Sequence, residues 1–196
     1  MLIKICGIAR PEDAETVVAA GAHLAGFVFV PGTPRALDPD AASWIRDVPV
    51  ATVGVFRDAT LDQVRRVRDR LRLDWVQLHG REPDDWLHIL GGRVIRRVGV
   101  RTPFQWSPLA DLARRCLPLI DPGGGDGRAF EWGRLHGRPP GVRFGLAGGL
   151  TPDTVGDAIR TVRPDMVDVS SGVEASPGVK DHGKVRAFVQ AALAAG

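Results

Sequence analysis

The amino-acid sequence predicts a single-domain α/β fold of the (β/α)8 barrel type, also called a TIM barrel, spanning residues 1–196. Apolar runs typical of strands alternate with amphipathic stretches typical of helices along the whole chain, which favours a parallel sheet with helical crossovers. Eight such units in 196 residues favour a closed barrel over an open, doubly wound sheet. Glycine-rich segments after the last two expected strands are typical of the phosphate site of such a barrel.

Each expected strand is a short apolar run, and each is followed by a stretch with helical periodicity. The strands are expected at Leu2–Cys6, Leu24–Val30, Val50–Val55, Trp75–Leu78, Val94–Val98, Leu117–Ile120, Phe144–Leu146 and Met166–Val169. The helices are expected at Pro11–Ala20, Asp40–Arg46, Thr60–Leu71, Glu82–Leu90, Pro108–Arg115, Trp132–Leu135, Pro152–Arg160 and Asp181–Ala195. Gly21 ends the first helix, and Thr60 with Gln63 resembles a capping box that opens the third.

The composition is that of a soluble globular protein, with 44% hydrophobic and 25% charged residues. The net charge of +3 favours a small anionic ligand, and because Lys and Arg are spread along the chain we expect no nucleic-acid partner. Cys6 and Cys116 are far apart and lack metal-ligand spacing, which favours a reduced, cytoplasmic protein. No apolar run approaches the roughly 20 residues of a membrane-spanning helix, and Met1 leads into a strand rather than a secretion signal.

Reactive residues of a barrel stand at the carboxyl ends of its strands, where alternation points every second side chain inward. Asp121, after the sixth strand, can equally be a turn residue, and Cys6 can be a small core residue. His79 can be a structural hydrogen-bonding residue, and Lys4 can pair with Asp168 inside the barrel. The polar candidates at strand ends are Cys6, Gln77, His79, Arg96, Asp121, Asp168 and Ser170.

Several kinds of chemistry lack their sequence motifs. No H-E-x-x-H, Cys-x-x-Cys or clustered His and Asp pattern indicates a metal site, so we expect no metal. There is no Walker loop and no G-x-S-x-G elbow. A thiol on the first strand, a carboxylate on the sixth and a phosphate cradle after the seventh and eighth favour proton-transfer isomerisation of a sugar phosphate.

Six segments in the same order resemble the phosphoribosylanthranilate isomerase family over essentially the whole chain. The resemblance implies an Amadori rearrangement of N-(5'-phosphoribosyl)anthranilate in tryptophan biosynthesis. It implies no cofactor, because the anthranilate nitrogen is the electron sink. The segments are Lys4–Ile8, Gly26–Phe29 with Pro34–Arg35, Val53–Phe56, Val76–Gly80, Ala147–Pro152 and Val167–Glu174, the last extended by Pro177–Asp181.

The resemblance also implies roles for individual residues. Asp121 matches the general acid that protonates the ring oxygen, Cys6 the general base that takes the proton from C2', and Arg35 the residue that holds the anthranilate carboxylate. Gln77 and His79 lie in a matching segment and are expected to contact the substrate. The 5'-phosphate is expected on backbone N–H groups of Gly148, Gly149, Ser170, Ser171 and Gly172.

The two catalytic roles place opposite demands on their surroundings. Asp121 must keep a proton near neutral pH, which requires burial or nearby negative charge. Cys6 must lose its proton, which requires a positive neighbour or an N–H donor. Lys4, two residues earlier on the same face, is the nearest candidate.

The glycine-rich loop after the sixth strand departs from the family pattern. Arg128 stands where the family has Lys, Ala129 stands where it has a hydroxyl residue, and Asp126 places a negative charge near an anionic substrate. Because this loop is expected to close over the substrate, its closure and the substrate range can differ from those of relatives.

Two alternatives stay open from the sequence. A histidine-pathway barrel isomerase acting on a phosphoribosyl aminoimidazole, or an enzyme of dual substrate range, shares the phosphate site but uses Asp where this chain has Cys6. A non-catalytic phosphate-ligand binder has no need of both Cys6 and Asp121. The expected partner is a phosphorylated small molecule, and the chain is expected to be a monomer or homodimer.

Overall fold

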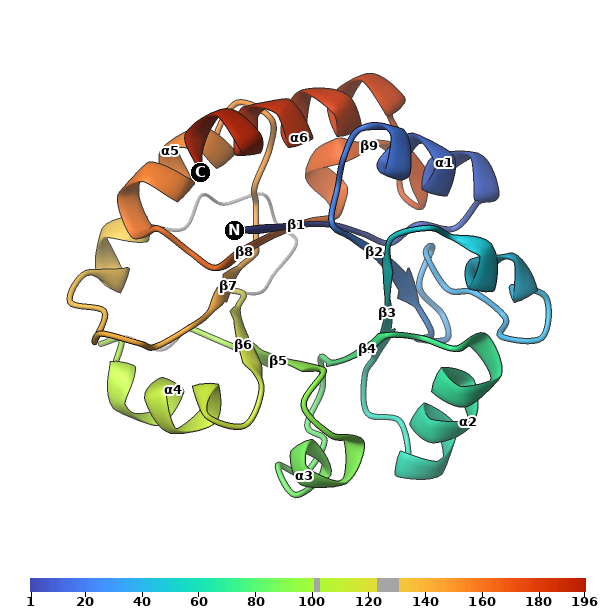
Figure 1. The fold of residues 1–196 in the computed structure, drawn as a ribbon, viewed down its shortest axis with the longest axis horizontal. Helices are drawn as coiled ribbons and strands as arrows, with labels where there is room; N and C mark the ends of the chain where they lie inside the picture. The colour runs from blue at the N-terminus through green and yellow to red at the C-terminus, as the bar shows by residue number, and fades with distance from the viewer. Residues whose placement is uncertain (101–102, 123–130) are drawn as a thin grey trace.

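Within residues 1–100, 103–122 and 131–196, which the computed structural model describes, eight parallel strands close into a barrel. Each strand pairs with its neighbour in sequence, β1 pairs with β8, and helices surround the ring (Figure 1). The loop positions Asp126, Arg128 and Ala129 lie outside the described residues. The strands are β1 Leu2–Cys6, β2 Leu24–Val28, β3 Ala51–Phe56, β4 Trp75–Leu78, β5 Val94–Val98, β6 Leu117–Ile120, β7 Gly145–Leu146 and β8 Met166–Val169.

The helices that connect the strands begin where local hydrogen bonding allows. In the capping box of α2, Thr60 accepts a hydrogen bond from the Gln63 amide at 3.2 Å, and the Gln63 side chain accepts one from the Thr60 amide at 2.8 Å. This prediction is confirmed. The α-helices are α1 Pro11–Ala19, α2 Leu61–Leu71, α3 Trp86–Leu90, α4 Trp106–Ala113, α5 Val155–Val162 and α6 His182–Ala195; the 3-10 helices are η1 Ser43–Asp47, η2 Trp132–Leu135 and η3 Ser171–Val173.

Two of the predicted helices begin three residues later than expected. The helix predicted from Asp40 is only the 3-10 turn η1, because the Asp38 carboxylate accepts the Asp40 amide at 2.9 Å and holds the chain in a turn. The helix predicted from Pro152 begins at Val155, since a turn forms first in which the Thr154 hydroxyl accepts the Thr151 amide. Side chains that bind nearby backbone compete with a helix start in both places.

A short antiparallel hairpin, β9 Glu174–Ser176 and β10 Val179–Lys180, lies between β8 and α6 and was not expected. Its turn carries Pro177 and Gly178, and Gly178 has φ +85°, a conformation that glycine adopts without strain. The Pro-Gly pair between two short polar runs was the available signal, but strands of two or three residues have no measurable alternation.

The barrel interior follows the two-residue alternation of strands. Leu2, Lys4 and Cys6 of β1 face inward, and Lys4 lies in register with Asp168 of β8. The Lys4 ammonium is fully buried and donates to both Asp168 carboxylate oxygens, at 2.9 and 3.0 Å. The pairing considered from the sequence is therefore present. One apolar cluster of buried residues contains Leu24, Val53, Ile95, Leu117, Leu119, Ala147 and Met166.

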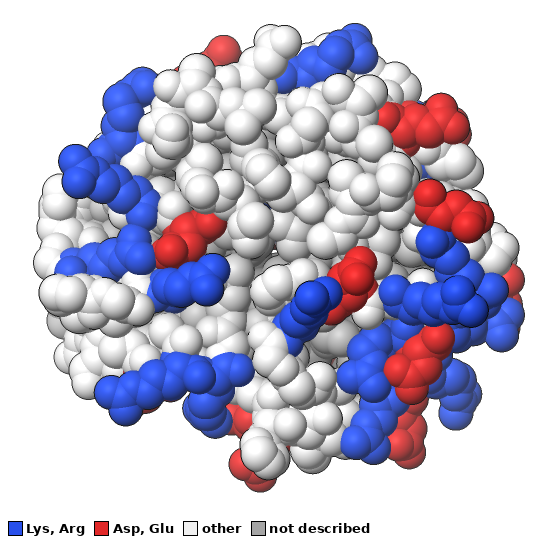
Figure 2. Space-filling model, in the orientation of Figure 1, with Lys and Arg blue, Asp and Glu red and all other residues white. Residues whose placement is uncertain are grey.

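The face of the molecule shown in Figure 2 carries charges of both signs. On the face in Figure 2, Lys and Arg lie mostly toward the periphery with Asp and Glu among them. Of the helices that the structure describes, none combines the length and apolar character required to cross a membrane.

We predict that Lys4→Met lowers the free energy of unfolding by about 3–5 kcal/mol, because it leaves the buried Asp168 carboxylate without its partner. Urea denaturation of the purified protein measures this. The double variant Lys4→Met/Asp168→Leu is expected to recover most of the loss. Arg160→Met, which removes an exposed ion pair with Asp157, serves as control and is expected to cost less than about 1 kcal/mol. A Lys4→Met loss no larger than the control's would contradict the prediction.

Candidate active site

A cavity of about 640 Å3 opens at the carboxyl ends of the barrel strands. Its lining comes from the ends of β1 to β8 and from the loops that follow them. All ten residues proposed from the sequence line this one cavity: Cys6, Arg35, Gln77, His79, Asp121, Gly148, Gly149, Ser170, Ser171 and Gly172.

Cys6 ends β1 with its thiol beside the buried Lys4–Asp168 pair. Burial raises the pKa of the Cys6 thiol, Lys4 opposes this increase, and Asp168 adds to it. Gly26 of β2 lies in register with Cys6. Because it has no side chain, it leaves room for the Lys4 ammonium group and the Cys6 thiol. A Cβ at position 26 would lie 3.0 Å from both the Cys6 sulfur and the Lys4 ammonium nitrogen. Lys4 is thus the positive neighbour expected for Cys6.

Asp121 faces the cavity just after β6, with His79 and Arg97 as neighbours. Its Oδ2 lies 3.6 Å from His79 Nε2 and 3.7 Å from Arg97 Nε. Burial lowers the pKa of His79 to about 4, with Arg97 acting in the same direction and Asp121 against it. His79 is therefore neutral at physiological pH. Its Nδ1 lies 3.2 Å from Nε2 of the Gln77 side chain.

Two arginines of the cavity wall were missed from the sequence. Arg97 of β5 and Arg57 after β3 both line the cavity, on either side of the β4 residues. The expectation that Arg96 faces the site is wrong, since its guanidinium binds Glu82 through Oε2 at 2.9 Å and the backbone oxygen at 2.8 Å. Arg97 is one position further on and so lies on the inward series, a signal that the alternation of β5 contained.

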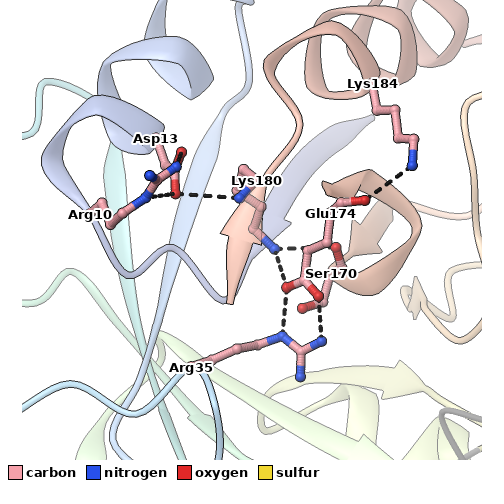
Figure 3. Close-up of polar contacts among 7 residues, drawn as sticks. All are labelled: Arg10, Asp13, Arg35, Ser170, Glu174, Lys180 and Lys184. Atoms are coloured by element: carbon pink, nitrogen blue, oxygen red, sulfur yellow. Dashed lines mark hydrogen bonds and ion pairs between the residues drawn. The ribbon is translucent and has the colours of Figure 1, made fainter. Parts of the chain in front are cut away.

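Arg35, in the loop after β2, reaches the cavity from the side of β1. Its guanidinium forms a two-point ion pair with Glu174, at 2.7 and 2.6 Å (Figure 3). Burial alone would raise the pKa of Glu174, but hydrogen bonds from Arg35 and Lys180 outweigh burial and lower it. Burial lowers the pKa of Lys180, although Glu174 opposes this. Sequence reasoning assigned no role to Glu174 or Lys180.

The expected phosphate cradle lies on the cavity wall formed after β7 and β8. Gly148 has φ +86°, and a Cβ there would run into the Pro122 ring. A Cβ at Gly172 would overlap the Leu150 carbonyl. Glycine is therefore required at both positions for the two loops to pack closely, and close packing leaves their backbone at the cavity surface.

The described residues contain no group of three His, Cys, Asp or Glu side chains arranged to hold a metal ion. The cavity wall carries two groups that can exchange protons, the Cys6 thiol and the Asp121 carboxyl group. Four cationic side chains of the wall and its surroundings, Lys4, Arg35, Arg57 and Arg97, suit an anionic ligand.

A sequence model of the family described as N-(5'phosphoribosyl)anthranilate (PRA) isomerase matches residues 3–191. The chain belongs to this family. The N-(5'-phosphoribosyl)anthranilate isomerase of Geobacter sp. (strain M21) is 45% identical over 194 residues, covering 95% of this chain and 95% of its own.

Solved structures of family members have the same fold. A phosphoribosyl anthranilate isomerase in complex with reduced 1-(o-carboxyphenylamino)-1-deoxyribulose 5-phosphate has a TM-score of 0.85 at 35% identity, covering 99% of this chain and 100% of its own. A structure of monomers of the dimeric Thermotoga maritima enzyme has a TM-score of 0.86 at 35% identity, with coverage of 99% and 100%. The prediction of a (β/α)8 barrel of this family is confirmed.

We predict that Cys6 reacts slowly with iodoacetamide at neutral pH, because burial raises its pKa and the protonated thiol is unreactive. The rate should increase with pH and reach its midpoint above the reference thiol pKa of about 8.5. Mass spectrometry of a Cys116→Ser background isolates the reaction of Cys6. A midpoint below that of free cysteine would contradict the prediction.

Proposed function

We propose that this chain isomerises N-(5'-phosphoribosyl)anthranilate to 1-(2-carboxyphenylamino)-1-deoxyribulose 5-phosphate, a step of tryptophan biosynthesis. One observation carries the proposal beyond membership of the family. The same cavity is lined by a thiol at the end of β1, a carboxyl group after β6, and the two glycine-containing loops that follow β7 and β8.

In the proposed mechanism Asp121 acts first, as general acid. It donates a proton to the furanose ring oxygen while the C1'–O bond breaks and the anthranilate nitrogen supplies electrons to form a Schiff base. The Cys6 thiolate then removes the proton from C2', and the electron pair moves to the nitrogen to give an enolamine. Tautomerisation of the enolamine gives the ketose product. Both transfers suit groups held within hydrogen-bond reach of the substrate.

The surroundings of Cys6 support its role. Lys4 is the cation that favours the Cys6 thiolate, and burial beside the apolar wall makes that thiolate a strong base once formed. The proposed phosphate cradle adjoins the proposed acid, since a Cβ on Gly148 would approach the Asp121 carboxylate to 3.1 Å.

Arg35 is proposed to hold the anthranilate carboxylate, because a guanidinium binds carboxylate through two parallel hydrogen bonds. Ser170, Ser171 and Gly172 complete the phosphate cradle with the glycines after β7. Gln77 and His79 are proposed to contact the substrate between these two anchors, His79 as a neutral hydrogen-bonding group.

We further propose that one domain, residues 1–196, acts in the cytoplasm without a cofactor or metal. The free thiols of Cys6 and Cys116 support a reducing compartment. The chain is proposed to be a monomer or a homodimer that binds a phosphorylated small molecule.

Cys6→Ser and Asp121→Asn are each expected to reduce kcat by about 10²- to 10⁴-fold, the usual range for losing one acid–base group. The loss of phosphoribosylanthranilate fluorescence measures the rate. Cys116→Ser, a buried cysteine remote from the cavity lining, is the matched control and is expected to keep wild-type kcat. Inactive wild-type protein would refute the proposed function, and near-normal kcat in either variant would remove that residue from its role.

Gly172→Ala is expected to raise KM by at least about tenfold. The new methyl group would push the loop away from the Leu150 carbonyl and so move the N–H groups that donate to the phosphate. Each hydrogen bond to a charged group is worth about 1.5–3 kcal/mol. Gly92→Ala is the control, since nothing lies within 4 Å of a Cβ at that position. Steady-state kinetics of both variants measure the effect, and equal KM values would show that the cradle does not bind the phosphate.

A further inference from the structure

The ion pair between Arg35 and Glu174 joins segments that are 139 residues apart in sequence. Arg35 Nε donates to Glu174 Oε1 at 2.7 Å, and Nη2 donates to Oε2 at 2.6 Å. The side chains are 25% and 5% exposed, so this is not a solvated surface pair. Both atoms of one edge of the guanidinium are committed to Glu174, which fixes the plane of the group.

Lys180 extends this contact to the phosphate cradle. Its fully buried ammonium donates to Glu174 Oε1 at 2.9 Å and to the backbone oxygen of Ser170 at 3.2 Å. Figure 3 shows Glu174 lying between Lys180 and Arg35. A continuous path of three polar contacts therefore runs from the loop after β8 to the guanidinium of Arg35.

The hairpin that carries these residues is itself held in place. The Lys180 amide donates to the buried Asp13 carboxylate at 3.4 Å, and the Lys184 ammonium donates to the Glu174 backbone oxygen at 3.0 Å. At the hairpin turn, Gly178 packs so closely on the Pro34 carbonyl that a side chain has no room. Neither Glu174 nor the loop of Arg35 can shift without breaking these contacts.

The ion pair with Glu174 leaves the other edge of the Arg35 guanidinium for a ligand. Among contacts of the described residues, Arg35 Nη1 has none to another side chain within hydrogen-bonding distance, and Arg35 lines the cavity. A free arginine side chain samples many rotamers and can follow a carboxylate to several positions. An arginine fixed by a two-point ion pair offers its donors at one position only.

Resting on the proposed function, we propose that Glu174 and Lys180 are positioning residues that set the span between the phosphate cradle and Arg35. The site thereby selects ribose-phosphate arylamines whose carboxylate is ortho to the nitrogen. A meta or para carboxylate points to a different place on the cavity wall, where the fixed guanidinium does not reach.

The test compares four reduced product analogues, made from ortho-, meta- and para-aminobenzoate and from aniline, which lacks the carboxylate. Calorimetry gives their Kd values for wild type, Glu174→Gln and Lys180→Gln. Glu12→Gln is the control, because it makes the same chemical change at an exposed ion pair of α1. Wild type is expected to bind the ortho ligand at least about tenfold more tightly than the meta and para ligands, as the loss of one charged hydrogen bond predicts.

Glu174→Gln is expected to reduce this preference to about threefold or less by weakening the ortho ligand alone, with the aniline ligand changed less than about twofold. Lys180→Gln is expected to act in the same direction and supplies the test if Glu174→Gln does not fold. Equal weakening of all four ligands, an unchanged preference, or tighter binding of the ortho ligand would overturn the inference. The isomerase activity of the wild type distinguishes failure of the proposed function from failure of this inference. An inactive wild type refutes the proposed function. An active wild type, with the preference for the ortho ligand unchanged in both variants, refutes only the inference.

Discussion

The ion pair between Lys4 and Asp168 is the contact on which the rest of this structure depends. It joins the first strand to the last at the centre of the barrel, in register, so it marks the point where the sheet closes. A buried ammonium and carboxylate are costly to desolvate, and each is tolerated only because the other is within 3.0 Å. The same pair places a cation beside the Cys6 thiol, so closure of the barrel and the positive charge next to this thiol depend on one interaction.

Around Cys6 the described charges form a larger group. Lys4, Lys180 and Arg35 all favour negative charge at the thiol, while Asp168 pairs with Lys4 and Glu174 pairs with both Arg35 and Lys180. Three positive and two negative side chains leave one positive charge in excess. A thiolate at Cys6 would make the group neutral, and this charge balance opposes the burial that raises the pKa of the thiol.

The fold and most of the site could be predicted because both depend on the period of two in strands. Alternation of the strand residues predicts that Cys6, Gln77 and Asp121 face inward, and the glycines after β7 and β8 indicate the proposed phosphate cradle. In β5 the same alternation was assigned one residue too early, so Arg96 was expected to face the cavity, whereas Arg97 does. An error of one position in a strand moves a side chain to the other face.

What the sequence could not predict depends on contacts between distant segments. Nothing local in Val173–Lys180 indicates that Glu174 reaches across to the loop after β2, because the partner is 139 residues away. Likewise, Glu82 resembled the first residue of a helix. In the fold its carboxylate accepts the Asp58 and Gly80 amides and pairs with Arg96, which delays the helix to Trp86. Tertiary hydrogen bonds override local helix signals at such positions.

A crystal structure of this protein with reduced 1-(o-carboxyphenylamino)-1-deoxyribulose 5-phosphate tests the central claim most directly. The account predicts the Cys6 sulfur within about 3.5 Å of C2' and the Asp121 carboxyl group at the former ring oxygen, the distance at which groups react. The phosphate should lie on Gly148, Gly149 and the loop after β8, with the carboxylate at Arg35 Nη1 and the Glu174 ion pair intact. A ligand bound in the reverse direction, or one that leaves Cys6 and Asp121 out of reach of these atoms, would contradict it.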